Sequence, residues 1–190
     1  VSIAANPGNV VCDGTTITFT ATPTNGGSNP TYQWFNGANP IEGETSNTYI
    51  ASTLTGGSSS VSDGNQISVQ LTSSESCTIT NPVVSEIITI SVIRNIQVSV
   101  TIDVTPENTI CEGTLVTFTA NSVTGGNNPG YQWFNGANPI IGETGGSYIT
   151  NALVNNDQIS VQLTSSEACA IGNPATSNAI TMTVNPNLPV

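Results

Sequence analysis

The chain has 190 residues, with twelve acidic residues, one basic residue and no histidine, so its formal net charge is −11 at pH 7. A surface of this sign repels nucleic acid and anionic membranes, which excludes nucleic acid as an expected partner. Only 7% of the residues are charged, so the composition is not that of a charge-rich disordered tail. No run of about 18 apolar residues is present, so no membrane insertion is expected.

Two long segments of the sequence occur twice. Tyr32–Ile41 recurs letter for letter as Tyr131–Ile140, and Gln66–Glu75 recurs as Gln158–Glu167. A repeat of roughly 100 residues matches one sandwich domain and is too long for a solenoid unit. The duplication therefore predicts two tandem domains, each with its own core.

The two domains are predicted to span residues 1–95 and 96–190. The repeated blocks are offset by 99 and 92 positions, so the first copy carries seven extra residues between them. These fall in the Gly/Ser-rich run Thr55–Asn65, which reads as a longer loop. The link between the copies, Ile93–Ile96, is short and apolar, and it favours a semi-rigid connection over a flexible tether.

Alternating apolar and polar residues predict strands along each copy. In the first copy they are Ser2–Ala5 (A), Thr16–Thr22 (B), Tyr32–Phe35 (C), Asn39–Ile41 (C′), Tyr49–Leu54 (E), Gln66–Ser73 (F) and Glu86–Val92 (G). No D strand is assigned. The dipeptides Asn36-Gly37 and Asn135-Gly136 predict hairpin turns after strand C.

The inward faces of these strands supply the predicted core. In strand B they are Ile17, Phe19 and Ala21, and strands F and G show the same alternation. Trp34 and Trp133 sit on strand C, where a tryptophan commonly fills the centre of a sandwich. The fold class is therefore all-β, with two tandem immunoglobulin-like antiparallel β-sandwich domains.

The four cysteines, Cys12, Cys77, Cys111 and Cys169, are divided two to a repeat. With no histidine and no closely spaced cysteine pair, neither a zinc site nor a catalytic cysteine is expected. Disulfides are the default for such cysteines in an extracellular protein. An extracellular context is expected for this chain, and disulfides are expected with it.

Two pairings of the cysteines are open. The first joins Cys12 to Cys77 and Cys111 to Cys169, within each repeat. The predicted strand order argues against it, because Cys12 lies in the A–B turn and Cys77 in the F–G loop, at opposite ends of a sandwich. Strand F alone spans about 25 Å, whereas bonded cysteines need Cα atoms within about 7 Å.

The second pairing is head-to-tail and is the favoured one. It joins Cys12 to Cys169 across the junction between the repeats. Cys77 and Cys111 are then unpaired in this chain, or they pair with the preceding and following repeats of a longer protein. Flanking repeats of the same chain are therefore expected partners.

Several short motifs resemble a known family. They are Cys-(Asp/Glu)-Gly-Thr before strand B, Thr-Phe-Thr-Ala, Tyr-Gln-Trp-Phe-Asn-Gly and Val-Gln-Leu-Thr-Ser-Ser-Glu-x-Cys. Together they resemble the immunoglobulin-like or polycystic-kidney-disease-like repeats of the giant cell-surface adhesins of Bacteroidetes, of the SprB-type gliding-motility kind. The resemblance implies a long exported filament that is moved along the cell surface and grips the substratum. It implies no catalytic residues.

No enzymatic site is predicted from the residues themselves. Glu42 and Glu44 are close in sequence, but the second copy has Ile141 at the Glu42 position, so a catalytic carboxylate pair is not indicated. No cofactor is expected. Calcium is a minor hypothesis, since it prefers carboxylate and carbonyl oxygens. Its candidate ligands are Asp13, Asp103, Glu107 and Glu112.

Phe35 and Phe134 are the candidate ligand contacts, because they alternate with the core tryptophans. Packing beneath the C′ segment is the favoured interpretation, and stacking on a sugar is the alternative. Three functions follow as hypotheses. The first is a stiff spacer in an adhesive filament. The second is a module that binds polysaccharide or a solid surface, with Thr55–Asn65 as its candidate loop. The third is an accessory domain of an exported enzyme.

Overall fold

The computed structural model describes residues 1–52 and 62–188 and divides into two compact units, Val1–Arg94 and Asn95–Val190. Their boundary lies one residue before the predicted one. Residues 53–54 of the expected E strand and most of the expected Thr55–Asn65 loop lie outside the described residues. The described part of the chain contains strands and no helix, and so no helix that could cross a membrane.

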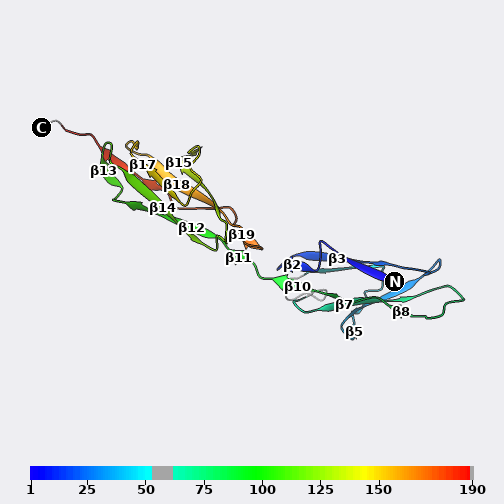
Figure 1. Cartoon of the computed structure of the whole chain (residues 1–190). Coiled ribbons are helices and arrows are strands. Elements are labelled where there is room, and N and C mark those ends of the chain that lie inside the picture. Colours follow the sequence, from blue (N-terminus) through cyan, green and yellow to red (C-terminus); the bar gives the residue numbers. More distant parts are fainter. Residues whose placement is uncertain (53–61, 189–190) are drawn as a thin grey trace. The chain divides into compact units, whose positions relative to one another are not determined.

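Unit 1 contains ten strands in its described residues (Figure 1). They are β1 (Ser2–Asn6), β2 (Val10–Cys12), β3 (Thr16–Thr22), β4 (Thr31–Asn36), β5 (Asn39–Pro40), β6 (Thr48–Ser52), β7 (Gln66–Thr72), β8 (Val83–Val84), β9 (Ile88–Thr89) and β10 (Ser91–Ile93). The predicted B strand has the observed bounds of β3, and the other predicted strands of sheet positions A, C, C′ and F agree to within one or two residues.

Two sheets of unit 1 face each other. Strands β1, β3 and β6 form one antiparallel sheet with β3 in the middle. Strands β5, β4, β7 and β8 form the other, and β9 also pairs with β7. These are the positions A-B-E and C′-C-F-G of an immunoglobulin-like β-sandwich, which confirms the predicted fold class. In addition, β10 pairs in parallel with β2.

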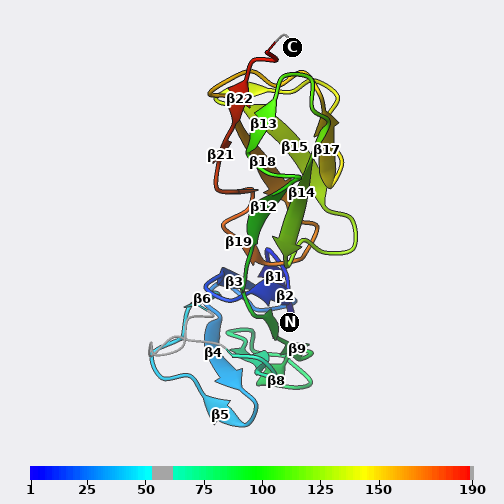
Figure 2. The ribbon, with the colours of Figure 1, turned by 90° about the vertical axis from the view of Figure 1, so that its left-hand side faces the viewer.

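Unit 2 repeats this topology. Its strands are β11 (Ile96–Gln97), β12 (Ser99–Thr105), β13 (Thr109–Cys111), β14 (Val116–Val123), β15 (Gly130–Asn135), β16 (Asn138–Pro139), β17 (Ser147–Thr150), β18 (Gln158–Thr164), β19 (Ala170–Ile171), β20 (Ala175–Thr176), β21 (Ile180–Thr181) and β22 (Thr183–Asn185). Strands β12-β14-β17 face β16-β15-β18-β20, and β13 runs parallel to β22 (Figure 2). One further parallel pair, β11 with β19, has no counterpart among the described strands of unit 1.

Each core is centred on three aromatic rings, because strands B, C and E each contribute one to the space between the sheets. In unit 1 the ring centroids of Phe19, Trp34 and Tyr49 lie 5.6 to 6.2 Å apart. The buried indole of Trp34 donates its Nε1–H to the carbonyl oxygen of Ser46 at 2.9 Å, so its polar atom is satisfied. Trp133 does the same with Gly145, also at 2.9 Å. The predicted core tryptophans are confirmed.

The buried ring of Tyr49 makes unit 1 sensitive to alkaline pH. Burial raises the pKa of Tyr49 above its ordinary value of 10.0, and the charge of Glu44 raises it further. Above about pH 10 an unfolded tyrosine loses a proton that the folded Tyr49 keeps, so the free energy of unfolding must fall as pH rises through that range. We expect Tyr49→Phe to weaken this fall. Urea midpoints from pH 8 to 11.5 check it, and equal slopes in both proteins would contradict it.

The turn after strand C shows why glycine is needed there. Asn36 pairs with Asn39, so the two turn residues are Gly37 and Ala38. Gly37 has a φ of 59°, a left-handed value that side chains with a Cβ rarely adopt. A positive φ at the first turn position suits a type II′ hairpin, whose twist matches that of the strands. The predicted hairpin is confirmed, with the turn one residue later than the Asn-Gly pair.

The prediction of one continuous G strand over Glu86–Val92 is wrong. The segment contains only the short strand β9 and most of β10, which pairs with β2, while β8 lies before the segment. The buried Ser85 lies between β8 and β9 and interrupts their ladder with β7. Its N–H donates to the carbonyl oxygen of Val69 at 2.9 Å, and its Oγ accepts the N–H of Val69 at 3.1 Å. Ser85 thus supplies both a backbone donor and a side-chain acceptor. In a regular ladder these two hydrogen bonds would be made by the backbone groups of two strand residues. Ser177 does the same in unit 2.

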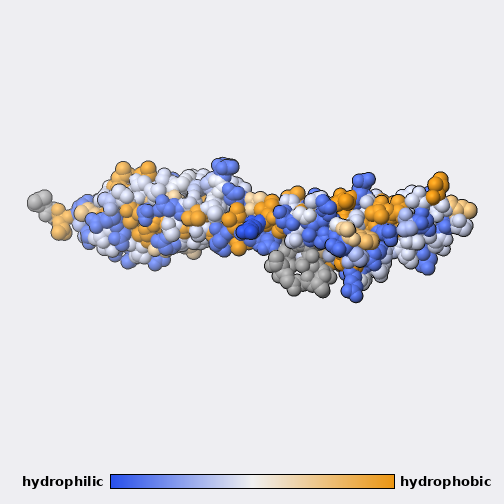
Figure 3. Space-filling view, turned by 90° about the horizontal axis from the view of Figure 1, so that it is seen from below, coloured by the Kyte–Doolittle hydropathy of each residue, from blue (hydrophilic) through white to orange (hydrophobic). Residues whose placement is uncertain are grey.

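Apolar side chains on the described surface are scattered. On the face shown in Figure 3, hydrophobic residues lie singly or in small groups among hydrophilic ones. Single exposed apolar residues are normal on soluble domains. The described faces of the sandwiches thus offer no large apolar patch as a candidate site, which leaves the cysteines at the ends of each sandwich.

Candidate functional site: the cysteine-bearing ends of each unit

One cysteine in each unit lies at the C-terminal end of that unit. Cys12 is the last residue of β2 and stands opposite Ile93, the last residue of β10. The next residue continues the pairing, since the N–H of Asp13 donates to the carbonyl oxygen of Ile93 at 2.9 Å. Cys111 stands opposite Asn185 in the same way. The expectation that Cys12 lies in an A–B turn is wrong, because its segment is a strand that pairs with the end of strand G.

The other cysteine of each unit lies at the opposite end, in the loop after strand F. In unit 2 the carbonyl oxygen of Cys169 accepts the N–H of Ile96, the first residue of β11, at 3.0 Å. In unit 1, Cys77 lines a pocket together with Val1. Strand F, seven residues long in both units, runs between the two ends. At about 3.3 Å per residue, it separates them by roughly 20 Å.

Each repeat has one disulfide-bonded cysteine and one free cysteine. Cys12 and Cys169 are disulfide-bonded, whereas Cys77 and Cys111 carry free, exposed thiols. Pairing within each repeat would require Cys77 and Cys111 to be bonded, so the structure excludes that alternative. The two bonded cysteines are instead one from each repeat, as head-to-tail pairing requires.

The weak calcium candidates lie on different elements. Asp103 is on β12, and one of its carboxylate oxygens accepts a hydrogen bond from the Nδ2 of Asn121 at 2.8 Å. Glu107 follows β12, while Asp13 and Glu112 each follow a cysteine. The described residues contain no group of three or more His, Cys, Asp or Glu side chains suited to a metal ion. Calcium binding stays a prediction.

Phe35 and Phe134 occupy matching places on the outer side of strand C. Each is half-buried and stands opposite a proline of the C′ strand, Pro40 or Pro139. Neither belongs to the buried core cluster of its unit. Packing beneath the C′ segment and contact with a polysaccharide both stay predictions.

One structural feature of these ends was not predicted from the sequence. Ile96, interpreted as the end of the linker, forms β11 together with Gln97, and the two residues pair in parallel with Ala170 and Ile171 of β19. The apolar-polar-apolar order of Ile96, Gln97 and Val98 was the available indication. The linker thus ends in a strand that belongs to unit 2.

No protein-family model matches the chain, and no curated protein matches it. Among solved structures it is similar to the three N-terminal domains of the highly immunogenic outer capsid protein (Hoc) of bacteriophage RB49. That match has 16% identity and a TM-score of 0.39, and it covers 96% of this chain and 59% of the Hoc chain. The chain is also similar to the human OSCAR ligand-binding domain, with 11% identity, a TM-score of 0.36 and coverage of 95% and 97%. Its function is therefore argued from its own residues.

Proposed function

We propose that the chain is a pair of non-catalytic spacer domains from an extracellular filament whose repeats are joined by disulfides. The observation that carries the proposal is the division of the cysteines: one is bonded and one is free in each unit. We infer that Cys12 and Cys169 form a single disulfide, and that Cys77 and Cys111 make the same bond with flanking repeats.

The short linker supports the inferred bond. Cys12 stands opposite Ile93, and Cys169 accepts a hydrogen bond from Ile96, so each bonded cysteine lies beside one end of the linker. Three peptide units join Ile93 to Ile96, and they span at most about 11 Å. This tether is short enough for the Cα separation of about 4.4–6.8 Å that a disulfide needs.

A disulfide also supports an extracellular location, because the cytosol keeps most thiols reduced. The resemblance to the repeats of gliding-motility adhesins suggests the role of a spacer in an extracellular adhesive filament. In such a filament the repeats space an adhesive tip from the cell, and the disulfides keep neighbouring repeats joined under load. This role requires no ligand-binding residue within the repeats.

Cleavage after glutamate tests the pairing, because it places each cysteine on its own peptide. The peptides are 1–42 with Cys12, 76–86 with Cys77, 108–112 with Cys111 and 168–190 with Cys169. After alkylation without reduction, we expect 1–42 linked to 168–190 and the other two peptides alkylated. A Cys77→Ser variant is the control and should give the same linked pair. A link between 1–42 and 76–86 would overturn the proposal.

A further inference from the structure

The loop after strand F carries its cysteine at the centre of a closed segment. In unit 2 this cysteine loop runs from Ser165 to Asn173, with Cys169 midway between them. The side chain of Asn173 closes its base, because the Oδ1 accepts the N–H of Ser165 at 2.8 Å and the Nδ2 donates to the carbonyl oxygen of Ser165 at 3.1 Å. A paired strand residue would make the same two hydrogen bonds with its backbone. The carboxamide thus ends the loop as a strand would.

The base of the loop is also bonded to the B–C loop, which precedes strand C. The Oγ of Ser165 donates to the carbonyl oxygen of Thr124 at 2.7 Å and accepts the N–H of Glu167 at 3.1 Å. The N–H of Ser166 donates to the carbonyl oxygen of Gly125 at 3.0 Å. Ser165 is buried, so these partners replace water for its hydroxyl. We call the bonds made by Ser165, Ser166 and Asn173 the loop clamp of unit 2.

A glycine lets the B–C loop pass close to the cysteine loop. Gly126 has a φ of 81°, and a Cβ there would lie 3.0 Å from the backbone nitrogen of Glu167. In unit 1, Gly27 has a φ of 78°, and its Cβ would lie 3.1 Å from the backbone nitrogen of Glu75. Glycine therefore suits this position in both units, for its backbone conformation and for the close approach.

The loop clamp of unit 2 also reaches the strand that follows the linker. The hydroxyl of Thr124 is shared between the carbonyl oxygens of Gln97 and Val123, at 2.5 and 2.6 Å. One residue before Gln97, the N–H of Ile96 donates to the carbonyl oxygen of Cys169 at 3.0 Å. Cys169 and the residue at which the linker enters unit 2 are therefore held next to each other.

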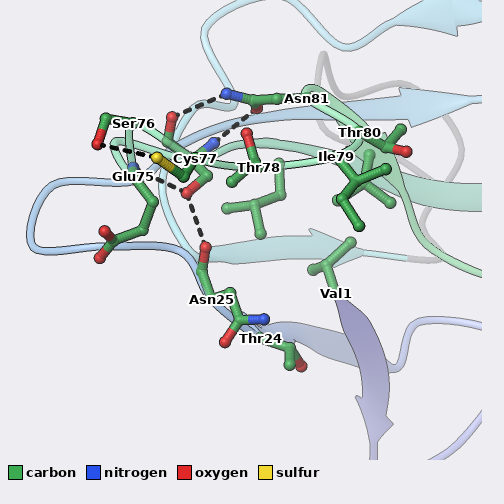
Figure 4. A pocket seen from close by; sticks show the side chains of 13 residues that line it. Val1, Thr24, Asn25, Glu75, Ser76, Cys77, Thr78, Ile79, Thr80 and Asn81 are labelled. Carbon is green, nitrogen blue, oxygen red and sulfur yellow. Dashed lines mark hydrogen bonds between the residues drawn. The ribbon is translucent and has the colours of Figure 1, made fainter.

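Unit 1 has the same clamp around a cysteine that carries no bond. Asn81 accepts the N–H of Ser73 at 2.9 Å and donates to its carbonyl oxygen at 3.0 Å. The Oγ of Ser73 donates to the carbonyl oxygen of Asn25 at 2.7 Å. Figure 4 shows these bonds as dashed lines from Asn81 and Asn25 to the base of the loop that carries Cys77. Since Cys77 is free, the clamp forms without a disulfide.

We propose that the loop clamp positions Cys169 for its disulfide, which makes Ser165 and Asn173 positioning residues for the bond between repeats. The inference rests on the proposed function, because it takes Cys12 as the partner of Cys169. A loop that is ordered before the bond forms loses less conformational entropy when it forms. Without the clamp, the reduced loop would sample more conformations, and the bond would have to restrict them. The clamp therefore shifts the equilibrium from the two thiols toward the disulfide.

The equilibrium with glutathione tests this role. In a Cys77→Ser, Cys111→Ser chain only Cys12 and Cys169 can react, and one oxidised glutathione becomes two reduced ones as their disulfide forms. After equilibration and alkylation, cleavage after glutamate gives linked or alkylated peptides 1–42 and 168–190, and their ratio gives the equilibrium constant.

Asn173→Ala and Ser165→Ala should each lower this equilibrium constant about tenfold, because each removes two hydrogen bonds from the clamp. Tenfold corresponds to a reduction potential that is about 30 mV higher. Asn173→Asp keeps the acceptor and loses the donor, so it should lower the constant by less. A change that destabilised the oxidised and reduced chains equally would not move the constant, so the measurement separates positioning from general stability.

The repeat supplies the matched controls. Asn81→Ala and Ser73→Ala remove the same bonds from unit 1, whose loop carries no thiol in this chain, and they should leave the constant unchanged. Should they lower it as much as the unit 2 variants do, or should Asn173→Ala and Ser165→Ala leave it unchanged, the clamp does not position Cys169. If Asn173→Ala does not fold, a wild-type constant in Asn173→Asp and Ser165→Ala overturns the inference equally. If the unmodified clamp yields no linked 1–42 and 168–190, the proposed function itself is wrong.

Discussion

Replacing Trp133 with alanine is expected to lower the free energy of unfolding of unit 2 by about 3–5 kcal/mol. The indole is fully buried and packs against Phe118 and Tyr148, with ring centroids 6.2 and 6.0 Å away. Its removal leaves a cavity between the sheets and the carbonyl oxygen of Gly145 without its donor. Since a domain of this size is stable by only about 5–15 kcal/mol, the loss is a large share of the total.

The chain offers its own reporter for this experiment. Trp34 is the only other tryptophan, and it lies in unit 1. In Trp133→Ala, urea unfolding followed by Trp34 fluorescence should keep the wild-type midpoint, while far-UV circular dichroism shows unit 2 unfolding at lower urea. Trp133→Phe is the matched control and should lose less, because a ring still fills part of the space. If the Trp34 midpoint falls by the same amount, the units do not unfold independently.

The strands that could be predicted are the long ones with one face inward. Strand B was predicted at Thr16–Thr22 because Ile17, Phe19 and Ala21 alternate with threonines, and the structure gives β3 these bounds. Such alternation reports directly which side of a strand leaves water. The core tryptophans followed from the same reasoning, since a large aromatic residue on a central strand has the core as its natural place.

The parts that could not be predicted depend on pairing between distant segments. Strands β2 and β10 have three residues each, and β11 and β19 have two, so none shows a full period of alternation. Their partners lie about 70–80 positions away in sequence, and short-range patterns carry no information about this. The buried Ser85 is a similar case, because a serine just before a predicted strand gives no indication that its hydroxyl replaces a backbone group.

The cysteine arrangement could be predicted in part. Their head-to-tail division followed from strand order alone, because strand F separates the two cysteines of a repeat. The strand identity of their surroundings did not follow, so Cys12 was assigned to a turn. The general topology is thus enough to disfavour a bond within a repeat, whereas the parallel pairing of β2 with β10 and of β11 with β19 could be found only in the structure.

If Cys12 and Cys169 are joined as proposed, the disulfide should remove most of the chain from the path of a pulling force. Load applied to the two termini then passes through residues 1–12, across the disulfide and through residues 169–190. At about 3.5 Å per residue, these segments extend to about 12 nm, whereas the whole chain extends to about 65 nm. Residues 13–168, which include both aromatic clusters, carry no load while the bond is intact.

Single-molecule force spectroscopy measures this difference. The oxidised chain is expected to reach its limit near 12 nm with no domain-sized step, and Cys12→Ser is expected to reach about 65 nm with two steps, one for each unit. Cys77→Ser is the matched control, because it removes a free thiol and should behave as the oxidised chain does. Two domain-sized steps in the oxidised chain would show that the bond does not join the units, and a filament of such repeats would then lengthen under load rather than hold its length.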